Sequence, residues 1–244
     1  MNTSTLNHLR RLTALALVAL ALASFNAPSR ASAIAGDDAE LREVLDAIGQ
    51  GSAVERLRRV TRGRAGWPTE AQAAEEFKIL RASEVFAPLR SLGHSEGGDE
   101  VARVRRVLAP LFELHGGSTL VVSVLHTPQV VHGIGRGSVL LVSTGLLQVV
   151  SDEELLALSA HEIGHQYFRR EFARAEDAGD KRALRLIEFK CDAIAALSLL
   201  VLNAEPDALA RGLDWVKGPA YSAVSGDTHP DLKLRKQLIA RLGT

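Results

Sequence analysis

The pentapeptide His-Glu-Ile-Gly-His, from His161 to His165, has the residue types and spacing of a hydrolytic metal site. Residues four apart share one face of a helix, so the two histidines can direct two imidazoles at one zinc ion. Glu162 lies at the edge of that face, where its carboxylate can accept a proton from a water molecule on the metal. The pattern predicts one Zn2+ per chain, held by His161 and His165, with Glu162 as the general base.

A pattern this short also arises by chance, so a third ligand must be found elsewhere in the chain. The residues after His165, "QYFRREF", hold neither the glycine nor the third histidine of the extended metzincin motif, which excludes that class. Glu188 comes 23 residues after His165, far enough for a loop and a return helix, and Asp192 follows four residues later on the same face. One carboxylate can bind zinc while the other accepts the free N–H of a zinc-binding histidine.

The alternative for Glu188 and Asp192 is a solvated helix face shared with nearby lysines and arginines. Both acids, however, come just before the apolar run "AIAALSLLVLNA", and acids rarely begin a buried helix without a partner. This context favours the metal site. Cys191 points to another side of the same helix and is expected to be a packed thiol.

Two predicted helices must position these residues. Ser151 and Glu154 have the spacing of a capping box, which predicts a helix from Ser151 to about Arg170. The second helix is predicted over 182–203. Ahead of both, the sequence is β-rich at 118–126 and 138–145. The strand at 138–145 either lies inside the sheet or pairs with an extended peptide substrate by strand addition.

The N-terminal part of the chain has helical spacing without a catalytic pattern. Apolar residues follow this spacing over 38–62, interrupted at 49–51, and again over 99–115. Thr69 and Gln72 form a further capping-box pattern. The sequence therefore predicts an α+β fold, mainly helical with a small β-sheet. Its domains are a helical region at 34–100, expected to be a scaffold or docking layer, and a catalytic domain at 101–244.

The first 33 residues have the layout of a secretory signal peptide. Arg10 and Arg11 precede an apolar run of 14 residues, and Ala31-Ser32-Ala33 offers a small-residue cleavage pattern. The run is short for a membrane span, although an uncleaved N-terminal anchor is the alternative. The single cysteine excludes an internal disulfide, and the net charge of +0 gives no indication of a nucleic-acid partner. We expect an exported protein of the bacterial periplasm or a similar compartment.

"HEIGH" followed by "EFKCD" from Glu188 to Asp192 resembles the HtpX and CAAX-prenyl-protease type of zinc metallopeptidase, which pairs H-E-x-x-H with E-x-x-x-D. The stretches "VSTGLLQVVSDEELLALSAHE" and "THPDLKLR" are similar to two more blocks of that family, and the resemblance covers roughly 101–242. Where the family usually has Asn-Ala-Phe/Tyr before the glycine-rich turn, this chain has Val130-Val131-His132. The chain looks more like the soluble, exported branch than the membrane-embedded HtpX branch.

The resemblance implies a zincin-type domain of the gluzincin class and assigns roles to individual residues. It implies zinc ligands at His161, His165 and Glu188, a general base at Glu162, and a partner for a ligand at Asp192. Arg235 stands at a matching position of the last block without an assigned role. His229, in the Thr-His-Pro block, has three open roles: stabilising the oxyanion of the tetrahedral intermediate, occupying the open metal position as a latch, or beginning a helix ahead of Pro230.

The sequence therefore predicts a zinc endopeptidase that hydrolyses protein or peptide substrates, including unfolded segments, in envelope protein quality control. An envelope protein is an expected partner. The alternative is a latched or non-catalytic zinc-binding chaperone or interaction module, since a structural zinc site is closed by four protein ligands. His126 and His132 are expected to be structural residues or to lie at the rim of the site.

Overall fold

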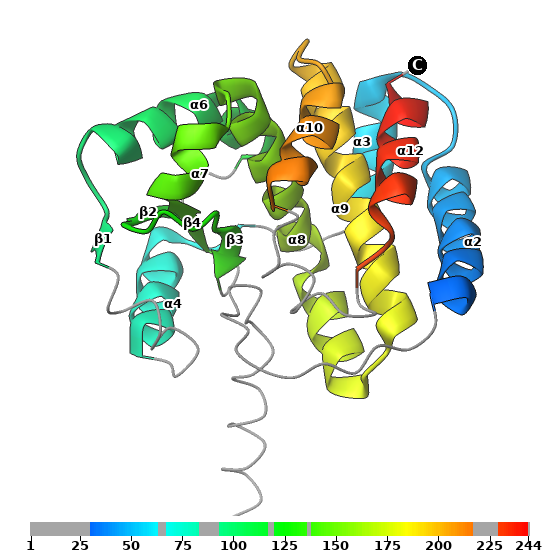
Figure 1. The fold of residues 1–244 in the computed structure, drawn as a ribbon, viewed down its shortest axis with the longest axis horizontal. Helices are drawn as coiled ribbons and strands as arrows, with labels where there is room; N and C mark the ends of the chain where they lie inside the picture. Colours follow the sequence, from blue (N-terminus) through cyan, green and yellow to red (C-terminus); the bar gives the residue numbers. More distant parts are fainter. Residues whose placement is uncertain are drawn as a thin grey trace, which may run out of the picture.

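The computed structural model describes residues 30–62, 67–82, 93–116, 120–135, 138–216 and 229–243. Most of the predicted leader, residues 1–29, lies outside this part of the chain. The described residues are mainly helical and include one small mixed sheet, which confirms the expected α+β class (Figure 1).

The elements follow one another in three groups. The N-terminal helices are α2 (Arg30–Ile48), α3 (Ala53–Thr61) and α4 (Glu70–Ala82). The middle of the chain contains β1 (His94–Ser95), α6 (Asp99–His115), β2 (Val121–Leu125), β3 (His132–Gly135), β4 (Val139–Ser143) and the short helix α7 (Thr144–Val149). The C-terminal part consists of α8 (Asp152–Ala178), α9 (Lys181–Val201), α10 (Asp207–Val216) and α12 (Leu232–Leu242).

The sheet has the strand order β1-β2-β4-β3, so β4 lies between two partners. It runs parallel to β2 and antiparallel to β3, and all five of its residues are buried. Of the two alternatives for 138–145, the interior strand is therefore correct, and strand addition to β4 is excluded because both of its edges are paired. The edge strand on this side of the sheet is β3.

Alternate residues of β2 and β4 pack against helices on opposite faces of the sheet, as the two-residue period of a strand requires. One set, with Val122, Val124, Leu140 and Val142, joins the core formed with α6 and α8. The other set contacts α4 through Phe77 and Leu80. In Figure 1 the sheet accordingly lies between α6 and α7 on one side and α4 on the other.

The helices α8 and α9 form a hairpin joined by Gly179 and Asp180. Gly179 has the left-handed conformation, with φ of 66°, that ends a helix without steric cost. The prediction that the first helix ends near Arg170 was wrong, since α8 continues to Ala178. The charged stretch after Arg170 contains no helix breaker before Gly179, and the buried Ala175 packs its far end.

Other predicted elements agree closely with the structure. The helix expected over 99–115 is α6, and the break at 49–51 separates α2 from α3. The capping boxes of Thr69 with Gln72 and of Ser151 with Glu154 are both formed. Leu41, Val44 and Ile48 of α2 pack in one core cluster with residues of α9 and α12. Among the described helices, none is long and apolar enough to cross a membrane.

Candidate metal centre and active site

The α8–α9 hairpin brings the predicted ligands together from two helices. The Nε2 atom of His161 lies 3.5 Å from Oε2 of Glu188, and Nε2 of His165 lies 3.4 Å from Oε1 of the same carboxylate. The potential ligand atoms of these three buried residues all lie within 4.8 Å of one another. The two imidazole rings stand nearly perpendicular, with centroids 5.1 Å apart. Two histidines and one carboxylate are therefore arranged around one point.

Asp192 orients the imidazole of His161 through the ring nitrogen that does not face Glu188. Nδ1 of His161 lies 2.9 Å from Oδ1 of Asp192, and the carboxylate accepts a hydrogen bond there because it has no proton to donate. Nδ1 thus carries a hydrogen, so Nε2, which faces Glu188, is the nitrogen left to bind a metal. Asp192 is fully buried and Glu188 nearly so, which rules out the solvated helix face as an account of these two acids.

Arg235 of α12 completes this arrangement. Its guanidinium donates from Nε to Oδ2 and from Nη2 to Oδ1 of Asp192, both at 2.7 Å. This paired geometry neutralises a carboxylate that would otherwise be a buried, uncompensated charge. The resemblance gave Arg235 a position but no role. The sequence did indicate that Arg235 is buried, because this arginine falls among the apolar positions of its helix, between Leu234 and Leu238.

The charges at the centre favour a bound cation. Burial by itself raises the pKa of Glu188, but the imidazoles of His229, His165 and His161 outweigh it and hold that pKa well below its ordinary value. Burial lowers the pKa of His161, but its hydrogen bonds with Asp192 and Glu188 outweigh this and raise the pKa to about 10. The ionised carboxylates of the centre thus require positive charge beside them, which either protonated imidazoles or a bound cation can supply.

The donor set fits zinc. Zn2+ is commonly bound by imidazole nitrogens and a carboxylate oxygen, and two histidines with one glutamate form a set that leaves the fourth position open in catalytic sites. The orientation of His161 by Asp192 is the supporting contact that zinc-binding histidines usually have. His161, His165 and Glu188 are therefore the residues that would hold the ion.

Glu162 lies beside this cluster and is held by the edge strand. Its Oε2 accepts a hydrogen bond of 3.0 Å from the backbone N–H of Ile134 in β3, and 14% of its side chain is exposed. Burial raises its pKa, but the neighbouring imidazoles of His132, His165 and His161 outweigh burial and lower the pKa to about 2. The carboxylate is therefore ionised at neutral pH, as a general base must be.

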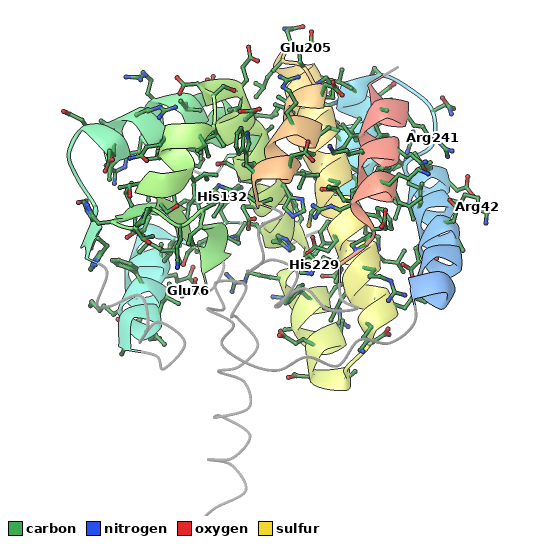
Figure 2. The ribbon with its side chains drawn as sticks, in the orientation of Figure 1. Arg42, Glu76, His132, Glu205, His229 and Arg241 are labelled. Carbon is green, nitrogen blue, oxygen red and sulfur yellow. The ribbon has the colours of Figure 1, made fainter. Side chains whose placement is uncertain are left out.

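His229 approaches the cluster from the segment before α12. Its Nε2 lies 3.7 Å from Oε1 of Glu188, and its side chain is 10% exposed. Among the described residues, the group of mutually close ligand atoms comprises His161, His165 and Glu188, and His229 is outside it. Figure 2 shows His229 beside α9 and His132 on the sheet side of the centre.

The two histidines His126 and His132, outside the motif, lie in different surroundings. His132 was expected to be structural or at the rim, and the structure places its buried side chain against Glu162 and Ser159. His126 lies at the sheet edge, with Nε2 2.6 Å from Oγ of Ser95, in agreement with a structural role. Cys191 is a buried free thiol, as predicted, and burial raises its pKa well above its ordinary value.

Comparison with known proteins agrees with this chemistry. The model of peptidase family M48 matches residues 100–176, from α6 through the histidine motif. Glu188, Asp192 and His229 lie beyond the matched residues. No curated protein matches the chain. The match supports assignment to the M48 metallopeptidases, which bind a metal, usually zinc, and thus supports a metallopeptidase with its candidate metal site at His161, His165 and Glu188.

Proposed function

We propose that this protein is a zinc-dependent endopeptidase that hydrolyses peptide bonds in protein substrates. One observation carries the proposal: Glu162, an ionised carboxylate, stands beside a buried cluster of two histidines and one glutamate that is suited to zinc. The family match supports metallopeptidase chemistry, and the finer assignment to zinc and to internal peptide bonds is ours.

Each residue of the site has a separate role in the proposed peptide hydrolysis. His161, His165 and Glu188 would hold the ion, and a bound Zn2+ supplies a Lewis acid that polarises the scissile carbonyl and acidifies water. Glu162 removes the proton from the attacking water and returns it to the amine that leaves. Asp192 keeps the imidazole of His161 in the orientation that ligation requires.

His229 stabilises the transition state in this proposal. Its side chain lies beside Glu188 yet outside the group of three ligands. An imidazole N–H at this place suits the oxyanion of the tetrahedral intermediate, because donors aimed at the developing charge stabilise it. We therefore favour this role over the latch and over a purely structural one.

The edge strand β3 is the best candidate for peptide binding. It has one paired edge, with β4, and the N–H of Ile134 on the other edge reaches Glu162. An extended substrate segment that adds to this edge would pass the general base. Extended segments are available in unfolded or loosely folded proteins, which supports unfolded segments as substrates.

The cellular role is proposed from the sequence alone. The layout of residues 1–33 supports export, and the resemblance supports a role in envelope protein quality control with an envelope protein as partner. Mass spectrometry of the mature chain tests the first point. A mature N-terminus at Ile34 supports signal cleavage, whereas a chain that begins at Met1 supports the uncleaved anchor.

The decisive experiment for the enzyme is Glu162→Gln. We expect the variant to bind one zinc ion per chain, as the wild type does, and to lose cleavage of unfolded casein because its amide cannot accept the proton. Zinc content by elemental analysis and cleavage rates are measured on the same samples. Equal cleavage rates for the two proteins would disprove the role of Glu162 as the base.

A further inference from the structure

His132 is a buried polar side chain beside the general base, and the proposed mechanism does not use it. It belongs to β3, and 2% of its side chain is exposed. Its Nδ1 lies 3.8 Å from Oε1 of Glu162, and its Nε2 lies 3.2 Å from Oγ of Ser159 on α8. One imidazole thus connects the edge strand with two residues of the helix that carries the histidine motif.

These contacts determine which ring nitrogen carries the hydrogen in neutral His132. The carboxylate of Glu162 can only accept hydrogen bonds, so a lone pair on Nδ1 would face negative charge. The favourable tautomer has the hydrogen on Nδ1, and Nε2 then accepts from the hydroxyl of Ser159, which can donate. Ser159 is fully buried and fixes the ring from its far side.

We propose that His132 is a positioning residue that orients the carboxylate of Glu162 for proton transfer. The backbone N–H of Ile134 holds Oε2, and the Nδ1–H of His132 faces Oε1. Two donors from one strand therefore define the plane of the carboxylate. This inference rests on the proposed function of Glu162 as the general base.

The distance of 3.8 Å is longer than a hydrogen bond, and this is compatible with the role. Hydrogen bonds of catalytic groups are often long in free enzymes and shorten in the substrate complex. Orientation matters here because a small misplacement of a reacting group lowers the rate of the chemical step, whereas it changes the affinity for the substrate much less. The role therefore predicts an effect on kcat, with KM nearly unchanged.

Three substitutions separate positioning of Glu162 from packing against Ser159. His132→Asn keeps an N–H near the place of Nδ1, His132→Gln keeps a polar group near the place of Nε2, and His132→Phe keeps only the ring shape. We expect His132→Phe to lower kcat by about 10- to 100-fold, by analogy with the range seen for side chains that orient metal ligands. His132→Asn should recover most of this loss, and His132→Gln should not.

Zinc content and thermal unfolding are measured for each variant, so that a folding defect is recognised. If His132→Gln recovers kcat better than His132→Asn, or if His132→Phe retains the wild-type kcat, the proposal is overturned. A rise in KM with unchanged kcat would also overturn it, because it would indicate a role in substrate binding.

A readout that does not depend on activity is the tautomer of His132 in the zinc-loaded wild type. Nitrogen NMR of histidine-labelled protein distinguishes the tautomers, and His132→Asn identifies the signal by its loss. Hydrogen on Nδ1 supports the proposal and hydrogen on Nε2 overturns it. A zinc-loaded wild type without peptidase activity would instead overturn the proposed function, and the tautomer would still decide whether His132 contacts Glu162 as inferred.

Discussion

At the scale of single residues, buried partners fix the atom that His161 presents to the centre. Asp192 binds Nδ1 of His161 and leaves Nε2 for the metal, while Arg235 neutralises Asp192. Because Asp192 and Arg235 are both buried, removing either one leaves an uncompensated charge in the core. Ligand orientation and local stability are therefore supplied by the same side chains.

His229→Ala tests the role of this histidine. We expect the variant to keep one zinc ion per chain, because the three-residue cluster does not include His229. We expect kcat to fall by about 10²- to 10³-fold, the usual effect of removing one donor to an oxyanion. Zinc content and casein cleavage are measured together. An increase in cleavage would instead identify His229 as a latch, and unchanged cleavage would leave it a structural role.

At the scale of elements, the distance between α8 and α9 sets the geometry of the metal centre. A Cβ atom added at Gly164 would lie 2.8 Å from Cα of Cys191. Gly164 belongs to the motif from His161 to His165. The residue that it contacts, Cys191, lies between Glu188 and Asp192 in the sequence. The helices can approach this closely only because Gly164 has no side chain.

Gly164→Ala should therefore separate the two helices and weaken zinc binding. Overpacking against a backbone atom costs about 1–3 kcal/mol, partly offset by about 1 kcal/mol from the better helix propensity of alanine. Gly212→Ala is the matched control, because its new Cβ would meet Cγ of the buried Leu158 at 2.9 Å, a crowded helix contact that involves no metal ligand. Urea unfolding and zinc titration of both variants check this expectation.

The expectation fails if Gly164→Ala binds zinc as tightly as Gly212→Ala does. That result would mean that the α8–α9 contact can relax without moving Glu188 away from the two histidines.

At the scale of the whole molecule, a buried polar network joins the helices α6, α8 and α9. His115 of α6 accepts at Nδ1 from the hydroxyl of Tyr167 on α8 and donates from Nε2 to Ser198 on α9. These directions follow because the hydroxyl of Ser198 donates to the carbonyl of Ile194. Burial lowers the pKa of His115 from 6.5 to about 4, so the imidazole is neutral in the folded protein.

This network makes stability depend on pH. The unfolded chain binds a proton on His115 near pH 6.5, whereas the folded protein excludes it until about pH 4. The contribution of His115 is therefore complete above pH 6.5 and declines as the pH falls towards 4. We expect a loss of about 2 kcal/mol between pH 7 and pH 5 from this group.

Urea unfolding at the two pH values, with a chelator present, measures this loss. His115→Gln is the control, because it keeps polar groups in the network and cannot titrate. The wild type should lose about 2 kcal/mol more than the variant between pH 7 and pH 5. Equal losses in the two proteins would show that His115 titrates normally.

The sequence by itself determined what depends on local spacing. The capping boxes, the helix at 99–115 and the break at 49–51 follow from hydrophobic periodicity and from turn residues, so they could be read from the sequence. The candidate ligands His161 and His165 were found in the same way, because a spacing of four already places two side chains on one face of a helix.

Only the tertiary structure decided which distant residues meet. Nothing in the local spacing indicates that β4 is paired on both edges, that Arg235 neutralises Asp192, or that His132 faces Glu162. These facts depend on how α12 and the edge strand pack against α8 and α9. Side chains far apart in sequence meet where buried surfaces fit together, and a linear pattern of residue types does not contain that information.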